Sequence, residues 1–182
     1  MIYNLIPPSD PRVLTQVAPF TDELLKEHTL KTRQELSDNL FETMLHYKGI
    51  GLSANQCGLP FRVFVMGGHS GFANGEKFSC FNPKVTAVSD QTVIMVEGCL
   101  TFPLLFVKIK RPAACKVEYE DVNGNKVEKE LSGLTARCFL HEYDHMQGVI
   151  MTDRISKLKF DMAVKKREKL FKRLEKMKNA RK

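Results

Sequence analysis

The sequence predicts an α+β fold in which antiparallel β-sheets pack around a central helix. Short runs of β-branched and aromatic residues follow one another from about residue 62 to residue 132, with no helical pattern between them. Amphipathic helical patterns stand before this region and after it. Consecutive strands with helices kept to the ends favour an antiparallel α+β domain over a parallel, doubly wound one.

The N-terminal part predicts an arm and then a helix. PPSDPRVL, at residues 7–14, holds three prolines, which favours an extended arm that lies over the body. From about residue 32 to residue 47, apolar side chains recur every three or four positions, and Gly49 follows. This pattern predicts an N-terminal amphipathic helix whose role is packing.

The middle of the chain predicts strands and a hairpin. The loop GIGLSANQCGLP leads into expected strands at 62–66, 78–82, 85–88 and 92–96. The stretch CKVEYEDVNGNKVEKELSG alternates polar and apolar residues on both sides of Asn123-Gly124, which predicts a β-hairpin. A helix is then expected from about residue 134 to residue 147, ending at Gly148.

The charge of the chain is concentrated at its C-terminal end. Residues 155–182 hold twelve Lys and Arg against three acidic residues, a net charge of +9, whereas residues 1–154 carry 16 bases and 18 acids, a net charge of −2. Apolar residues recur among these cations, which predicts a basic amphipathic helix. The sequence thus divides into a body, 1–156, and a basic C-terminal helix, 157–182.

Length and composition predict one domain in the cytoplasm. The 182 residues are 43% hydrophobic and 27% charged, and no apolar run approaches the ~20 residues that cross a bilayer. The N-terminus has no signal-peptide pattern, so we expect a cytoplasmic monomer, bacterial or made in a bacterial host. Five cysteines, an odd number without C-x-x-C, argue against a disulfide framework.

The segment FLHEYDHMQG contains the pattern H-E-x-x-H on the helix expected near residues 134–147. Residues four apart share a helix face, so His141 and His145 can bind one ion while Glu142, about 100° round, stands beside it. Two core histidines without a metal are the alternative. Leu134 and Cys138 lie on the same stripe, which turns the histidines inward.

A third ligand must come from elsewhere, because no histidine or glutamate follows closely after His145. Cys99 is the best candidate, since it stands in EGCLTFP directly after a glycine that lets a ligand loop form. A thiolate with two imidazoles suits zinc or ferrous iron, and the spacing does not decide between them. Gln56, in GIGLSANQ, could donate a hydrogen bond to a developing oxyanion, although such a glycine pair is commonly a turn only.

These three motifs, in this order, resemble those of the peptide deformylases: G-x-G-L-A-A-x-Q, E-G-C-L-S and H-E-x-D-H. Here they are GIGLSANQ, EGCLT and HEYDH, so Ser53 replaces an alanine and Thr101 a serine. The N-terminal arm and the order of the strands and final helix match as well. After the second motif, residues 103–106 are apolar where many bacterial members are polar or basic.

The resemblance implies that the N-formyl group is removed from the N-terminal methionine of new polypeptides, releasing formate. It implies that Cys99, His141 and His145 bind Fe²⁺, with Zn²⁺, Ni²⁺ or Co²⁺ as substitutes. Glu142 would be the general base, and Gln56 with the backbone N–H of Leu100 would stabilise the oxyanion.

The resemblance also implies how the formyl-methionyl peptide binds. Ile50 and Gly51 would pair with its backbone as an added strand, and Ile50, Leu134 and Cys138 would line the methionine pocket. Glu97 and Gly98 are also expected at the substrate. An ion pair between Asp144 and Arg111 would hold the metal helix on the sheet.

Two other functions remain to be weighed. A general H-E-x-x-H metallopeptidase would cleave unformylated peptides, and a non-catalytic ribosome-binding module would carry only a structural metal. The basic helix, 157–182, either packs its apolar stripe on the body as a solvated helix or docks on ribosomal RNA. Docking on ribosomal RNA is what the resemblance to some bacterial deformylases implies.

Overall fold

The body of the protein is a five-stranded antiparallel sheet with strand order β1-β2-β3-β6-β7, seen in the computed structural model, which describes residues 1–72 and 75–179. Its strands are β1 (Gly51–Ser53), β2 (Val63–Gly67), β3 (Lys77–Val88), β6 (Ala114–Glu120) and β7 (Lys126–Ser132). A separate antiparallel pair is formed by β4 (Thr92–Cys99) and β5 (Phe102–Pro112). The predicted α+β class with antiparallel sheets is confirmed.

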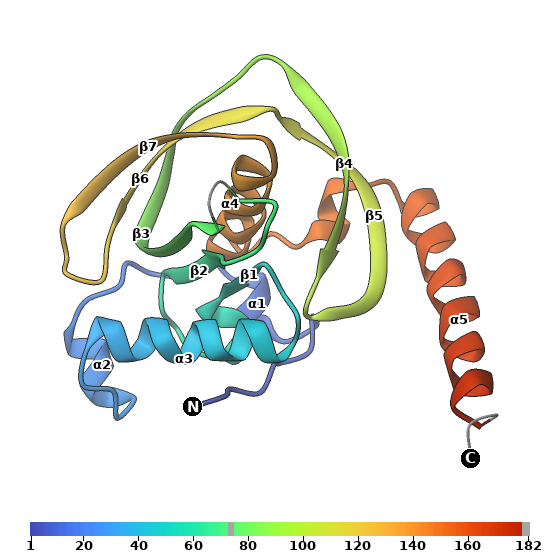
Figure 1. Ribbon diagram of the computed structural model, residues 1–182, viewed down its shortest axis with the longest axis horizontal. Helices are drawn as coiled ribbons and strands as arrows, with labels where there is room; N and C mark the ends of the chain where they lie inside the picture. The colour runs from blue at the N-terminus through green and yellow to red at the C-terminus, as the bar shows by residue number, and fades with distance from the viewer. Residues whose placement is uncertain (73–74, 180–182) are drawn as a thin grey trace.

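Helices cover the sheets and project from them. They are α1 (Pro11–Leu14), α2 (Glu23–Glu27), α3 (Arg33–His46), α4 (Gly133–Met146) and α5 (Lys157–Asn179), with short 3₁₀ helices at Ala54–Cys57 and Met151–Arg154. In Figure 1, α4 lies at the centre behind the strands, α3 crosses below β1 and β2, and α5 extends beyond β5. None of the helices within the described residues is long and apolar enough to cross a membrane.

Strand β2 is buried on both faces and separates two hydrophobic clusters. Successive strand residues point to opposite faces. Val63 and Val65 therefore join the cluster that contains α3, while Phe64 and Met66 join the cluster that contains α4. Phe64 meets Phe139 of α4 edge-on, with ring centroids 5.0 Å apart. The sheet is thus held between α3 and α4, and α4 is almost wholly buried.

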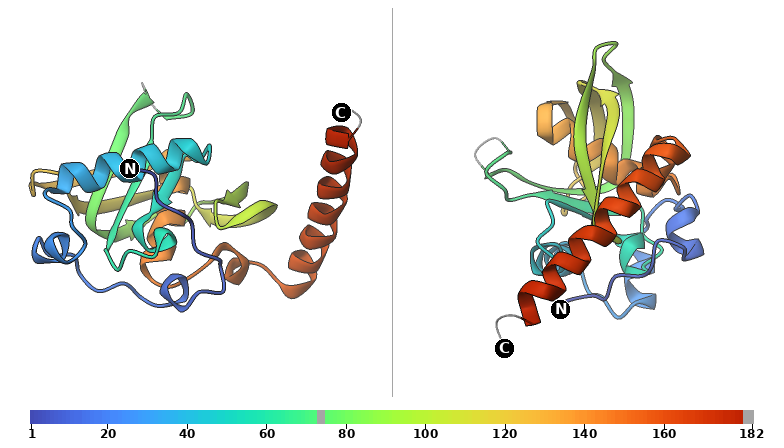
Figure 2. Two further views of the ribbon diagram at one scale, coloured as in Figure 1. Left: turned by 90° about the horizontal axis from the view of Figure 1, so that it is seen from below. Right: turned by 90° about the vertical axis from the view of Figure 1, so that its right-hand side faces the viewer.

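Helix α5 rests on β5 through its first two turns only. Phe160, Ala163 and Val164 pack against the cluster formed by the inward side chains of β5, among them Leu105 and Val107. Beyond these turns the helix carries exposed apolar side chains and most of its cations: Phe171, Leu174 and Met177 are between 42% and 48% exposed. Figure 2 shows this second half standing away from the body, and residues 180–182 of the predicted basic helix lie outside the described residues.

The structure differs from the sequence prediction at several elements. The expected strands 78–82 and 85–88 form one strand, β3, whose register shifts at Asn82 and Pro83. Asn82 adopts a positive φ of 50° and Pro83 has no N–H for the ladder, which explains the apparent break. The arm at 7–14 contains one helical turn, α1, because Asp10 caps it and Pro11 begins it. Strand β5 was not predicted, and the expected loop GIGLSANQCGLP contains β1 and a 3₁₀ helix.

Candidate active site

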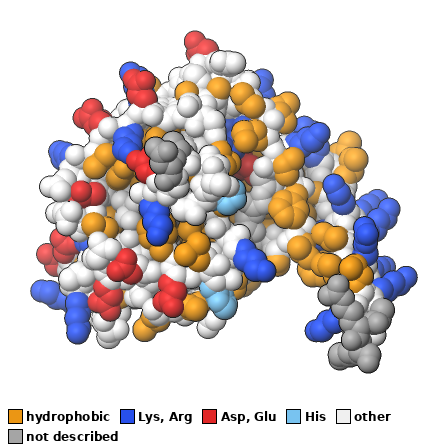
Figure 3. Space-filling model, viewed as in Figure 1, with side chains coloured by type: hydrophobic (Ala, Val, Ile, Leu, Met, Phe, Trp, Pro, Cys, Tyr) orange, Lys and Arg blue, Asp and Glu red, His pale blue; other side chains and the backbone are white. Residues whose placement is uncertain are grey.

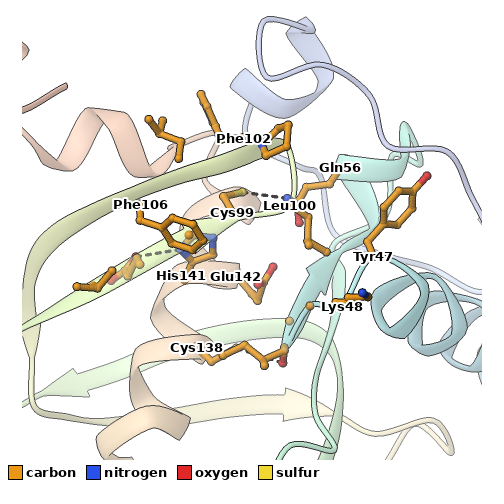
Figure 4. Close-up of a pocket in the computed structure, with 18 of the residues that line it drawn as sticks. Tyr47, Lys48, Gln56, Cys99, Leu100, Phe102, Phe106, Cys138, His141 and Glu142 are labelled. Carbon is orange, nitrogen blue, oxygen red and sulfur yellow. Dashed lines mark hydrogen bonds and ion pairs between the residues drawn. The ribbon is translucent and has the colours of Figure 1, made fainter. Parts of the chain in front are cut away.

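A pocket of about 650 Å³ opens between β1, the β4–β5 turn and α4. Figure 4 looks into this pocket. Cys99 and His141 lie near the centre of the view, Gln56 lies above them to the right, and Cys138 lies below them. In Figure 3 a hollow with apolar side chains along its margin lies between the body and α5. The pocket therefore brings together three segments that are far apart in the sequence.

Cys99 and His141 line this pocket, and His145 lies next to both of them. One ligand atom from each of the three lies within 4.8 Å of the others, and Cys99 Sγ is 3.4 Å from His145 Nε2. The two histidines come from adjacent turns of α4. Cys99 ends β4, where a register shift after Gly98 changes the direction of the strand.

The surroundings of Cys99 favour its thiolate. Burial alone would raise the pKa of this thiol, but the imidazoles of His145 and His141 lower it well below its ordinary value. Gln56 Nε2 donates a hydrogen bond to Cys99 Sγ at 3.2 Å, and the Thr101 hydroxyl lies 3.1 Å from it. The thiolate is the form of cysteine that binds metals.

Glu97 fixes the orientation of His141. Its Oε2 lies 2.9 Å from His141 Nδ1, and Arg111 and Arg137 donate to its carboxylate at 2.7 and 2.9 Å. Although burial opposes ionisation, His141 and Arg111 lower the pKa of Glu97 below its ordinary value. With Nδ1 donating to Glu97, His141 keeps Nε2 as the nitrogen with a free lone pair.

The residues present fit a divalent cation. A thiolate and two imidazoles converge, and they leave room in the pocket for a water molecule or a substrate atom. His145 Nδ1 is buried without a hydrogen-bond partner among the described residues. Three protein ligands beside an open pocket are typical of a catalytic metal site rather than of a closed structural one.

Glu142 lies beside these ligands and is only 3% exposed. Burial raises its pKa above the ordinary value, although His141 and His145 oppose this effect. Its Oε2 accepts a hydrogen bond from Ser53 Oγ at 2.6 Å. Its Oε1 lies over Gly51, where any Cβ would collide with that oxygen and would lie 2.8 Å from Cys138 Sγ. Only glycine fits at Gly51 without a shift of Glu142.

Most of the other site residues suggested by the sequence also line the pocket. These are Ile50, Gly51, Gln56, Glu97, Gly98, Leu100, Leu134 and Cys138. Arg111 and Asp144 do not line it, but Arg111 Nη1 of β5 donates to Asp144 Oδ2 of α4 at 2.7 Å. Arg154 donates to the same carboxylate.

The sequence reasoning missed several residues of the site. Arg137 contacts Glu97 and lines the pocket, and its place four residues before His141 on one helix face was the signal that could have found it. Ser53 was noted only as a small departure from a motif. Tyr47 and Lys48 also line the pocket, and no local pattern marks them. The apolar residues 103–106, which the sequence singled out after the second motif, line it as well.

Comparison with known proteins gives one consistent result. The profile of the polypeptide deformylase family matches residues 4–161. A peptide deformylase of Wolbachia sp. subsp. Brugia malayi (strain TRS) is 43% identical over 148 residues, which cover 77% of this chain and 82% of the relative.

Solved structures agree. The crystal structure of peptide deformylase from Thermotoga maritima superposes with a TM-score of 0.74 at 37% identity, covering 86% of this chain and 99% of that one. The enzyme from Ehrlichia chaffeensis gives a TM-score of 0.79 at 30% identity, covering 94% and 98%. The chain therefore belongs to the polypeptide deformylase family, and it is a metal-dependent enzyme that removes the formyl group from the N-terminal methionine of nascent polypeptides.

Proposed function

We propose that Cys99, His141 and His145 hold the metal ion of this deformylase, and that the ion is Fe²⁺, with Zn²⁺, Ni²⁺ or Co²⁺ as substitutes. One thiolate and two imidazoles within 4.8 Å support this proposal, because such a donor set suits ferrous iron and zinc. A cation bound there supplies a Lewis acid, which lowers the pKa of a bound water from ~15.7 toward ~7 and polarises a carbonyl oxygen.

In this proposal Glu142 moves the proton of the reaction. Its Oε2 is engaged by Ser53, so Oε1 is the oxygen that accepts the proton of the attacking water molecule. The same oxygen returns that proton to the methionine nitrogen when the C–N bond breaks and formate leaves. Burial supports this role, since it raises the pKa of Glu142 toward the range in which a carboxyl group both accepts and donates.

Gln56 and Leu100 would stabilise the oxyanion that forms at the formyl carbon. Gln56 Oε1 accepts from the backbone N–H of Ser53 at 3.0 Å, which fixes the orientation of the amide. One of its two Nε2 protons is directed at Cys99 and the other is left for the substrate. The backbone N–H of Leu100, directly after Cys99, would be the second donor. One such donor typically contributes ~3 kcal/mol to transition-state stabilisation.

The substrate peptide would add as a strand beside β1. β1 is an edge strand of the five-stranded sheet, and its residue Gly51 lines the pocket next to Ile50, which supports main-chain pairing there. Ile50, Leu134 and Cys138 would form the wall for the methionine side chain. Burial raises the pKa of Cys138 well above its ordinary value, so this thiol stays neutral as an apolar wall requires.

Glu97 and Gly98, both expected at the substrate, have different roles in this proposal. Both residues line the pocket, but the Glu97 carboxylate is occupied by His141, Arg111 and Arg137. We therefore assign Glu97 to the orientation of His141, and Gly98 to the close approach of the substrate backbone.

The observation that carries these assignments is that Cys99, His141 and His145 converge, with Cys99, His141 and Glu142 lining one pocket. The test is formate release from formyl-Met-Ala-Ser by protein prepared without oxygen and loaded with iron, compared with Cys99→Ser. We expect the wild type to release formate, and Cys99→Ser to lose bound metal and activity together. Cleavage of unformylated peptides without formate release would instead favour a general metallopeptidase.

The basic helix has its own proposed partner. α5 carries ten Lys and Arg against three acidic residues, and Figure 3 shows the cations along its outer side, which supports docking on ribosomal RNA. Ribosome co-sedimentation should then weaken steeply as salt is raised. We further propose that the protein acts in the bacterial cytoplasm, because its nascent substrates occur at the ribosome. We also propose that it acts as a monomer.

A further inference from the structure

Ser53 is a buried residue that contacts two side chains of the proposed mechanism at once. It ends β1 and is 0% exposed. Its hydroxyl donates to Glu142 Oε2 at 2.6 Å, and its backbone N–H donates to Gln56 Oε1 at 3.0 Å. One residue therefore joins the group that moves the proton to the group that faces the oxyanion.

The Ser53 hydroxyl fixes the orientation of the Glu142 carboxylate. Among the hydrogen bonds of residues 1–72 and 75–179, Ser53 is the one donor to this carboxylate. Without it, the terminal torsion of a glutamate has a broad, roughly two-fold distribution. With it, Oε2 is held at Ser53, and Oε1 is left beside Gly51, a residue of the pocket lining.

We propose that Ser53 is a positioning residue for deformylation, which holds Glu142 Oε1 and Gln56 Nε2 toward one reacting formyl group. This inference rests on the roles proposed above for Glu142 and Gln56. The backbone contact to Gln56 is open to any residue at this position. The contact to Glu142 requires a hydroxyl, which the alanine of the motif G-x-G-L-A-A-x-Q does not have.

The family motif G-x-G-L-A-A-x-Q has alanine at this position, so the fold accommodates the loss of the hydroxyl. An alanine at position 53 keeps the strand and the backbone contact to Gln56, and removes one oxygen atom only. Glu142 would then lose the bond that selects one of its oxygens for the pocket. We expect the proton-transfer step to slow, because a misplaced acid–base group loses rate while the peptide still binds.

The test compares Ser53→Ala with a matched control, Ser37→Ala. Ser37 is also buried, and its hydroxyl pairs with that of Ser79 at 2.7 Å between α3 and β3, away from the pocket lining. We expect Ser53→Ala to lower kcat for formyl-Met-Ala-Ser about tenfold with KM and bound metal unchanged, as for a contact used in the transition state. Ser37→Ala should leave kcat as in the wild type.

A second pair of variants separates positioning from general destabilisation. If Ser53 acts through the Glu142 carboxylate, Ser53→Ala should cost no further rate in a Glu142→Gln background. The same tenfold loss in both backgrounds would overturn the inference, as would an unchanged kcat in Ser53→Ala or a fall that follows lost metal. Full activity in Glu142→Gln alone would contradict the proposed function itself, which is a different outcome.

Discussion

Glu97 contacts three buried basic side chains of the site, those of Arg111, Arg137 and His141. Its Oε1 accepts from Arg111 Nε and Arg137 Nη1, and its Oε2 accepts from Arg111 Nη2 and lies against His141 Nδ1. A carboxylate offers about four lone-pair positions, so Glu97 has none left for the substrate. Its work is to hold His141 in one orientation and one tautomer.

Removing this carboxylate should weaken both metal binding and the fold. We expect Glu97→Ala to lower metal affinity by about 10–100-fold, the usual effect of losing a group that orients a ligand. Arg111 and Arg137 would be left buried without this partner, at a cost of about 3–5 kcal/mol in the free energy of unfolding. Zn²⁺ competition titration and urea unfolding would measure the two effects. The exposed Glu118→Ala is the control, and equal values for both variants would contradict the role.

The cysteines should differ in reactivity. Burial raises the pKa of Cys57 to about 12, so this thiol keeps its proton at pH ~7. Despite its burial, Cys99 has a pKa well below its ordinary value because of the imidazoles of His145 and His141, which favours the thiolate. We expect iodoacetamide to alkylate Cys99 of the metal-free protein first, and bound Zn²⁺ to protect it. Peptide mass spectrometry would follow the two sites, and faster labelling of Cys57 would contradict this account.

At the scale of elements, Asp144 links α4 to β5 and to the 3₁₀ helix that follows α4. This buried carboxylate accepts from Arg111 of β5 and from Arg154 in the 3₁₀ helix that follows α4. Arg111 also binds Glu97 of β4, so one guanidinium joins both strands of the β4–β5 pair to the helix that carries His141 and His145. We therefore expect this junction to hold Cys99 and the histidines at a fixed distance.

Replacing Arg111 should loosen the junction. Arg111→Met keeps most of the volume but leaves Glu97 and Asp144 without their shared cation, and we expect a loss of about 3–5 kcal/mol in the free energy of unfolding. Metal retention and deformylase activity should fall with it. Lys110→Met, on the exposed face of the same strand, should change none of these. Normal stability, metal content and activity in Arg111→Met would show that the pair has no such role.

At the scale of the whole molecule, α5 serves two different purposes along its length. Its first turns complete a hydrophobic cluster with β5, while the rest carries cations and exposed apolar residues away from the body. Deleting 167–182 should therefore leave the free energy of unfolding within about 0.5 kcal/mol of the wild type. Deleting 157–182 uncovers β5 and should cost about 2 kcal/mol or more.

The two truncations also test the partner proposed for the helix. Both should lose ribosome co-sedimentation at low salt, because both lack most of the cations. Unchanged co-sedimentation after deletion of 167–182 would exclude docking through this part. Equal stability of the two truncated proteins would show that the first turns contribute nothing to the body.

The sequence alone predicted those features that are encoded locally. Helices α3 and α4 have regular apolar spacing, and the β6–β7 turn has its Asn123-Gly124 pair, so both were expected within a residue or two. The sequence predicted two strands in place of β3, because Asn and Pro at positions 82 and 83 are typical of a strand end. In the structure a β-bulge accommodates both residues, and this bulge depends on the pairing of β3 with β6. Strand β5 alternates, but Gly98 before it and Pro103 at its second position are typical of a turn, so no strand was expected there.

The site residues also differ in how far the sequence alone predicts them. The two histidines and Glu142 follow from one helix, and Cys99 from a short motif. The bonds from Glu97 to Arg137 and from Ser53 to Glu142 join residues 40 and 89 positions apart, so only the folded chain brings them together. Sequence spacing gives no measure of such contacts.

The central claim is that Glu142 moves the proton in a pocket where Cys99, His141 and His145 hold the metal. The most direct measurement is formate release from formyl-Met-Ala-Ser by Glu142→Gln, with bound metal measured in the same sample. We predict a fall in kcat of about 10²–10⁴-fold with metal content equal to that of the wild type. Wild-type kcat in a fully metal-loaded Glu142→Gln protein would contradict the account.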